Sequence, residues 1–151
     1  MDQESASSSG YTAASIKVIS FEDSVRRRPQ MYFGRSLRDP ALANAVVRAV
    51  VGDALYEPFV DGVRVSLVIE SDLRFSVSDD NPTITLGADD VPQLGFFDSL
   101  ISRRRWAIAA AAVMSRHTRI EVNVAGRTWR QDLSGTSVDG PLLEGNHSRV
   151  T

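Results

Sequence analysis

Carboxylate and guanidinium side chains are the groups of this chain best suited to chemistry. Asp53 and Glu57 stand four residues apart in a segment with a helical spacing of apolar residues, so both are expected on one face of a helix. Two adjacent carboxylates can serve general acid–base catalysis. The same pair is also typical of the solvated edge of a helix, and the sequence leaves both interpretations open.

A basic run, Arg103-Arg104-Arg105, precedes an alanine-rich segment that we expect to be helical. Cations at a helix start oppose the helix dipole, so an anionic partner such as a phosphate would stabilise them there. A solvated basic turn is the alternative. Trp106 follows the run directly and is expected in the core or in the wall of a pocket rather than as a platform for nucleic-acid bases.

The composition excludes several classes of site. The chain has no cysteine, which excludes disulfides, thiolate catalysis and zinc–thiolate sites, and it has only 2 histidines, so we expect no metal site and no cofactor. A net charge of −2 argues against direct nucleic-acid binding. No apolar run approaches the roughly 20 residues that span a bilayer, and the first residues do not resemble a signal peptide. We therefore expect a cytoplasmic protein without membrane association.

Apolar periodicity predicts the elements that must position these groups. Leu42, Val46 and Val50 recur at helical spacing, whereas Val65, Leu67 and their neighbours alternate with polar residues as in a strand. The predicted elements are a short strand at 16–20, a helical turn before Pro29, a helix at 40–57, strands at 63–70 and 73–78, a loop at 79–96, a helix at 97–116, a hairpin at 120–133 and a loop at 134–151.

This order of elements is typical of an α+β fold. We expect a two-layer α/β sandwich, with a mostly antiparallel sheet covered on one face by helices. Residues 1–15 are rich in serine and alanine and lack periodicity, so we expect a flexible N-terminal arm. Residues 16–151 are expected to form a single domain.

The stretch from Ile16 to Gly34 resembles the opening of the ATP-binding domain of DNA gyrase B subunits and topoisomerase IV. Its core, Arg28-Pro29-Gln30-Met31-Tyr32, follows the family pattern R-P-G-M-Y, and the likeness extends over about residues 16–150. The resemblance implies the two-layer sandwich of GHKL ATPases. It also places Tyr11 where the family has an arm tyrosine that reaches the partner subunit, which implies a homodimer through the N-terminal arm.

The chain departs from this family at the catalytic helix. The family has E-x-x-x-N there, with the glutamate activating water and the asparagine holding magnesium. The corresponding positions here are Ala49 and Asp53. Alanine cannot accept a proton, and loss of a general base costs about 10²–10⁴ in rate. Asp53 could still bind a cation.

A second departure follows the second predicted strand. The family has D-x-G-x-G, whose aspartate accepts a hydrogen bond from the adenine amino group. The resemblance gives that position to Asp79 and an apolar wall position to Ile84, but Asn81 and Thr83 replace the two glycines. Without the family, an aspartate after a strand is equally typical of a turn cap.

The third departure is a shortened lid. The family's glycine-rich lid cradles phosphates with backbone N–H groups, whereas here only about fifteen residues separate Asp79 from the next predicted helix, with no glycine cradle. We also expect the domain to lack the family's transducer and DNA-cleaving domains. The resemblance with these losses implies neither an active ATPase nor a topoisomerase.

Our first functional expectation is a nucleotide pocket repurposed for a small molecule, with a cofactor-free isomerisation or cyclisation as the chemistry that it would support. The expected catalytic residues are Asp53, Asp79 and Glu57. The expected ligand-binding residues are Val50, Val77, Ile84, Tyr32, Tyr56, Trp106, Arg103, Arg104 and Arg105.

Two alternatives stay open. One is a protein-interaction or dimerisation module that acts on a gyrase-type topoisomerase, for which the arm with Tyr11 is the supporting feature. The other is ATP binding without turnover, supported by Asp79.

Overall fold

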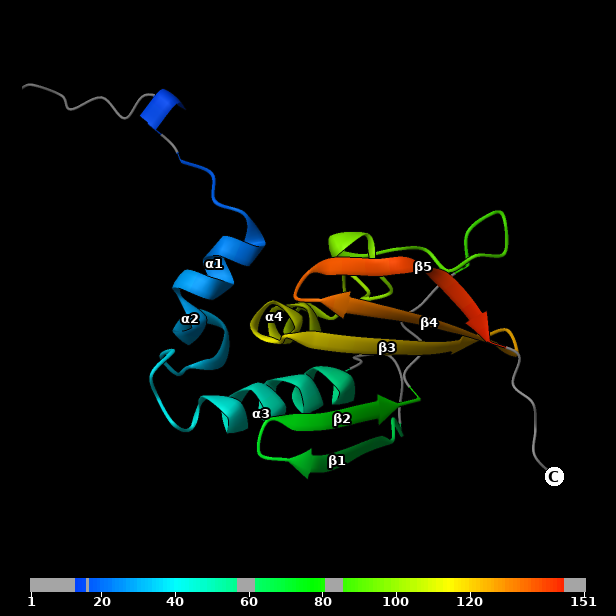
Figure 1. Ribbon diagram of the computed structural model, residues 1–151, viewed down its shortest axis with the longest axis horizontal. Helices are drawn as coiled ribbons and strands as arrows, with labels where there is room; N and C mark the ends of the chain where they lie inside the picture. Colours follow the sequence, from blue (N-terminus) through cyan, green and yellow to red (C-terminus); the bar gives the residue numbers. More distant parts are fainter. Residues whose placement is uncertain (1–12, 16, 57–61, 81–85, 146–151) are drawn as a thin grey trace, which may run out of the picture.

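The computed structural model describes residues 13–15, 17–56, 62–80 and 86–145. The chain has an α+β fold with two small antiparallel sheets and a few helices (Figure 1). In chain order the elements are the 3₁₀ turn η1 (Ala13–Ser15), the helices α1 (Phe21–Arg27), α2 (Pro29–Phe33) and α3 (Leu42–Leu55), the strands β1 (Val65–Ser71) and β2 (Arg74–Asp79), the 3₁₀ turn η2 (Phe96–Asp98), the helix α4 (Trp106–Met114), and the strands β3 (His117–Val124), β4 (Arg127–Ser134) and β5 (Ser137–Gly145).

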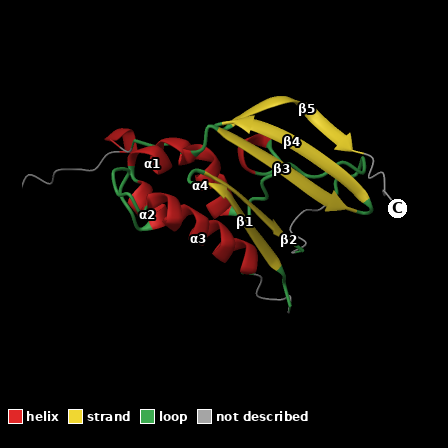
Figure 2. Ribbon diagram, turned by 60° about the horizontal axis from the view of Figure 1, so that its bottom comes forward, coloured by secondary structure: helices red, strands yellow, loops and turns green. Residues whose placement is uncertain are grey.

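The strands are divided between two sheets. The hairpin β1–β2 forms one, with Leu67 opposite Val77, and the strands β3, β4 and β5 form the other in that order. Both are antiparallel, as the alternation of the sequence predicted. Figure 2 shows the helices gathered beside the two sheets, with the β1–β2 hairpin against α3.

Two short helices follow from local capping signals. The side chain of Ser20 accepts a hydrogen bond from the backbone N–H of Asp23 at 3.1 Å and so caps the start of α1. α1 ends before Pro29, which is the first residue of α2, where its missing N–H is harmless. α2 ends at Gly34, whose φ of 69° is left-handed and suits glycine. The short strand expected at 16–20 is wrong for residues 17–20, which belong to no strand.

The second long helix is shorter than predicted. α4 begins at Trp106 instead of near Phe97, because the preceding loop closes on itself. The backbone N–H of Gly95 donates to the carbonyl of Ser99 at 2.7 Å, and that of Phe96 donates to Ile101 at 2.8 Å. Phe97 has a φ of 57°, which is incompatible with a right-handed helix.

The segment predicted as a C-terminal loop contains a strand. β5 (Ser137–Gly145) pairs with β4, with Val138 opposite Leu133. Gly140 and Pro141 made this segment look like a loop. A proline is nevertheless tolerated on an edge strand, and β5 pairs on one side only among the described strands.

The core is built around α4. Its alanines pack on one side against Val25 and Phe33 of the short helices, and on the other against Ile101 and Leu133. Because alanine side chains are small, α4 approaches both neighbours closely, as its composition predicted. None of the helices in the described ranges is long and apolar enough to cross a membrane.

Candidate functional site

Asp53, Asp79 and Arg105 come together at the N-terminal end of α4, although they are far apart in the sequence. Nη2 of Arg105 donates a hydrogen bond to Oδ1 of Asp79 at 2.9 Å. Oδ2 of Asp53 accepts a hydrogen bond from the backbone N–H of Ala107 at 3.2 Å. α3, β2 and α4 each contribute to this cluster, which we call the α4 cluster. It unites two of the three predicted catalytic residues with one predicted ligand-binding residue.

The guanidinium of the ion pair in the α4 cluster is removed from solvent, whereas Asp79 as a whole residue is exposed. Arg105 is 4% exposed as a residue, and the side chain of Asp79 is 18% exposed. A charge-assisted hydrogen bond in such surroundings is stronger than one at a wet surface. Nη1 of Arg105 is also buried, and the described part of the chain offers it no hydrogen-bond partner. The guanidinium is therefore held by Asp79 with part of its donor capacity unused.

Asp53 combines a structural and an electrostatic role. A helix start leaves backbone N–H groups without partners, and Asp53 satisfies that of Ala107. Burial raises the pKa of the Asp53 carboxyl, and the negative charge of Asp79 adds to this effect. The hydrogen bond from Ala107 and the positive charge of Arg105 act in the opposite direction but do not cancel it. Asp53 therefore holds its proton to a higher pH than an ordinary aspartate.

Three of the predicted site residues, Tyr11, Glu57 and Ile84, lie outside the described residues. The predicted pairing of Asp53 with Glu57 therefore stays a prediction.

The predicted apolar wall residues are spread over several environments. Val50 is buried in α3, and Val77 is half-buried on β2. Tyr56 follows the end of α3 and is 74% exposed. Tyr32 donates its hydroxyl hydrogen to Oγ of Ser24 at 2.7 Å, and its ring lies 6.3 Å from that of Trp106.

The basic run is divided by the fold. Arg105 is buried in the α4 cluster, whereas Arg103 and Arg104 are exposed. The backbone N–H of Arg104 donates to Oγ of Ser102 at 3.3 Å, which holds the turn before α4. Arg103 lies at a separate hollow of the surface.

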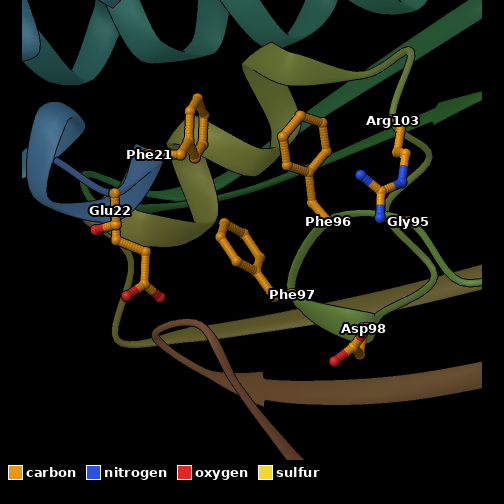
Figure 3. A pocket seen from close by; sticks show the side chains of 8 residues that line it. Phe21, Glu22, Gly95, Phe96, Phe97, Asp98 and Arg103 are labelled. Carbon is orange, nitrogen blue, oxygen red and sulfur yellow. The ribbon is translucent and has the colours of Figure 1, made fainter. Parts of the chain in front are cut away.

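This hollow lies between the start of α1 and the loop 95–103, has a volume of about 370 Å³, and is open to solvent (Figure 3). Of the predicted site residues only Arg103 lines it, so sequence reasoning missed this feature. The signal in the sequence was the pair Phe96-Phe97 after Gly95. The prediction divided this pair between the loop at 79–96 and the helix at 97–116. The lining residues are Ser20, Phe21, Glu22, Gly95, Phe96, Phe97, Asp98 and Arg103. We call this feature the aromatic hollow.

Three phenylalanine rings form the apolar part of the aromatic hollow. The ring centroids of Phe21 and Phe96 are 5.2 Å apart, and those of Phe96 and Phe97 are 5.9 Å apart. Their interplanar angles of 36° and 46° are those of tilted contacts. The rings therefore support one another and present a joint aromatic surface.

The described residues bring together no group of three or more histidine, aspartate or glutamate side chains that could hold a metal ion. No model of a known protein family matches the chain, and no curated protein matches it by sequence.

Proposed function

We propose that the chain is a non-hydrolysing relative of the gyrase B ATPase domain, built as a GHKL-type two-layer sandwich, that binds a small molecule other than ATP. The R-P-Q-M-Y motif at 28–32 and the order of the elements support the kinship. The observation that carries the functional part is the ion pair between the buried Arg105 and Asp79.

The ion pair competes with adenine. In the related ATPases the carboxylate at the position of Asp79 accepts a hydrogen bond from the adenine amino group. Here Nη2 of Arg105 already donates to Oδ1 of that carboxylate at 2.9 Å. An adenine that bound in the family's manner would have to share this carboxylate with the Arg105 guanidinium, using an acceptor site that Arg105 leaves open. Because Arg105 already draws on the negative charge of Asp79, the adenine contact is weaker than in the family.

The groups for hydrolysis are also missing. Ala49, half-buried in α3, stands at the position of the general base and cannot take a proton from water. Asp53 stands at the position of the magnesium ligand, but its Oδ2 is engaged by the backbone of α4. An isomerisation or cyclisation without a cofactor would rely on Asp53, whose raised pKa suits proton transfer better than that of an ordinary aspartate.

Calorimetric titration with a non-hydrolysable ATP analogue and magnesium tests the proposal. We expect no binding by the wild type at millimolar analogue, because Oδ1 of Asp79 already accepts a hydrogen bond from Arg105. Asp79→Ala serves as the control for the adenine contact. Micromolar binding by the wild type that disappears in Asp79→Ala would overturn the proposal and establish ATP binding without turnover.

The β1–β2 hairpin supports a second candidate, a protein-interaction module that associates with a second copy of this chain. Leu67 and Ile69 share the face of the hairpin that carries Phe75 and Val77. α3 covers this face incompletely, since Leu67 remains 42% and Ile69 59% exposed. Among the described strands β1 also pairs on one side only, and an apolar edge strand of this kind is prone to pair with another chain.

Light scattering after size-exclusion chromatography tests this second candidate. If the hairpin mediates association, the wild type is a dimer, and the double substitution Leu67→Thr with Ile69→Thr makes it a monomer. Leu73→Thr is the matched control, because Leu73 is 88% exposed on the same hairpin but lies at its turn. A monomeric wild type over the full concentration range would exclude the dimer.

A further inference from the structure

We propose that the aromatic hollow binds a flat aromatic monocarboxylate, with its ring on Phe21, Phe96 and Phe97 and its carboxylate on Arg103. This inference rests on the proposed function in one respect, since it locates the small molecule away from the family's nucleotide position. The volume of about 370 Å³ lies within the range of about 300–1,000 Å³ that is usual for ligand pockets.

The wall of the hollow selects an aromatic body. Figure 3 shows the rings of Phe21, Phe96 and Phe97 around one space. All three rings also pack against the buried clusters beneath, so they are anchored from behind. A planar ligand can make offset or edge-to-face contacts with such rings, which adds to the free energy gained by covering them.

The charges of the rim select a single carboxylate. Arg103 lies beside Gly95 at one end of the hollow, and Glu22 lies at the other (Figure 3). Glu22 has Arg26 at 3.9 Å, whereas Arg103 forms no ion pair with any described residue. The guanidinium is therefore the group available for an anion, and it can hold a carboxylate through two parallel hydrogen bonds.

Asp98 limits the charge of the ligand. It lines the same hollow and is exposed, so a di- or triphosphate on Arg103 would meet its negative charge. A monocarboxylate meets the same repulsion to a smaller extent, because it places only one negative charge at Arg103 and directs an apolar ring to the rest of the lining. The hollow is thus unsuited to a nucleotide triphosphate.

The loop that carries these residues is fixed in an uncommon conformation. Phe97 and Asp98 have φ angles of 57° and 52°, a region that non-glycine residues seldom adopt. The loop is held by the bond from Gly95 to Ser99, and by Oε1 of Gln131, which accepts from the N–H of Leu100 at 2.8 Å. Strained backbone of this kind persists only where the surrounding structure maintains it. It is found most often at ligand sites and active sites. Both Phe97 and Asp98 line the hollow.

Titration of ¹⁵N-labelled full chain with 2-naphthoate and with its neutral analogue 2-naphthamide tests the inference. We expect 2-naphthoate to shift the amide resonances of Gly95, Phe97 and Glu22, with an affinity about fivefold higher than that of the amide, the size expected of an exposed ion pair. Equal affinities for the two probes, resonance shifts confined to other parts of the chain, or no binding at millimolar probe would each overturn the inference.

Arg103→Gln is the decisive variant, and Arg104→Gln is its matched control on the same exposed turn. Arg103→Gln should bind both probes alike, because only the ion pair distinguishes them. Arg104→Gln should keep the fivefold preference. Since the readout is a ratio within one folded variant, a change in stability does not affect it. A preference that survives in Arg103→Gln, or is lost in Arg104→Gln, would contradict the role of Arg103.

The two proposals fail separately. A wild type that binds the ATP analogue through Asp79 while keeping its naphthoate preference would overturn the proposed function and leave the aromatic hollow intact. A wild type that binds neither the analogue nor 2-naphthoate would overturn the inference about the hollow alone.

Discussion

At the scale of single residues, Arg105 is the group on which the α4 cluster depends. Its guanidinium pairs with Asp79, and its charge also acts on Asp53. Arg105→Met should lower the free energy of unfolding by about 1.5–3 kcal/mol, because it removes the charge-assisted hydrogen bond between the buried guanidinium and Asp79. The loss is smaller than for a fully buried pair, because Asp79 as a whole residue is exposed. Urea denaturation monitored by circular dichroism measures the change.

Two further variants identify the cause of that loss. Arg103→Met, on an exposed position of the same basic run, should change the free energy of unfolding by less than about 0.5 kcal/mol. Asp79→Leu introduced into Arg105→Met should cost less stability than Asp79→Leu alone, because the two side chains interact directly in the wild type. If Arg105→Met and Arg103→Met are equally stable, the ion pair does not hold α4 in place.

Asp53 makes the free energy of unfolding depend on pH, and the direction of this dependence follows from its raised pKa. Its pKa is raised above the ordinary value of 3.8, so between these two values the native state binds more protons than the unfolded state. Its contribution to stability is fully present below pH 3.8 and is lost as the pH rises through the folded-state pKa. Arg105 and Asp79 are the charged groups that act on it.

Asp53→Asn removes this titration while keeping an oxygen that can accept from Ala107. The free energy of unfolding of Asp53→Asn, minus that of the wild type, should therefore increase as the pH rises from acidic conditions towards neutrality. Urea denaturation of both proteins over that interval gives the difference at each pH. A difference that stays constant or decreases would show that the Asp53 pKa is not raised.

At the scale of elements, the loop before α4 is fixed by Gly95. A Cβ at this position would lie 2.1 Å from the carbonyl oxygen of Ile101 and 2.9 Å from the backbone nitrogen of Arg103. Because both neighbours are backbone atoms, Gly95→Ala must displace the loop, and it should cost about 1–3 kcal/mol or more. The same substitution should disturb the resonances of the aromatic hollow. Thermal unfolding and an NMR spectrum of the variant measure the two effects.

Gly52 provides a control at which the same substitution is expected to raise stability instead of lowering it. It lies within α3, and a Cβ added there would meet no atom within 4 Å. Gly52→Ala should stabilise the protein by about 0.5–1 kcal/mol, because alanine loses less conformational entropy in a helix. Equal effects of the two substitutions would show that the loop tolerates a side chain at position 95.

The elements could be predicted wherever side-chain periodicity decides the structure. The alternation of Val65, Leu67 and Ile69 gave the first hairpin, and the spacing of Leu42 and Val46 gave α3. The prediction failed where backbone hydrogen bonds, not side-chain periodicity, determine the structure. Residues 95–101 are apolar enough for a helix but form a closed loop, and β5 contains residues that are usual in loops.

The candidate site was predictable by residue type but not by pairing. Asp53 and Asp79 were identified from the sequence, and Arg105 was expected to bind a ligand. Its pairing with Asp79, 26 residues away, depends on the course of the chain between β2 and α4, which has no periodic signal. The aromatic hollow was missed for a related reason, because left-handed backbone at Phe97 and Asp98 cannot be anticipated from residue type.

At the scale of the whole molecule, the buried residues are distributed unevenly. α4, the loop before it and β4 hold most of the buried residues, whereas β1 and β2 contain none. The two sheets share no strand among the described residues, so the hairpin contributes little to the core. A two-stranded hairpin alone is marginally stable in water. The β1–β2 hairpin therefore depends on its contact with α3.

Native-state hydrogen exchange should show this division. Amides of the β1–β2 hairpin, such as Leu67 and Val77, should exchange through local opening at a free energy well below that of global unfolding. Amides of β4 such as those of Trp129 and Leu133 should exchange only on global unfolding, because both residues are buried and pair with β3 on one side and with β5 on the other. Added denaturant should then accelerate exchange strongly in β4 and weakly in the hairpin, since little surface is exposed when the hairpin opens. Equal protection in both sheets would mean that the hairpin unfolds together with the core. In that case α3 would have to couple the two sheets more tightly than its incomplete cover of Leu67 and Ile69 implies.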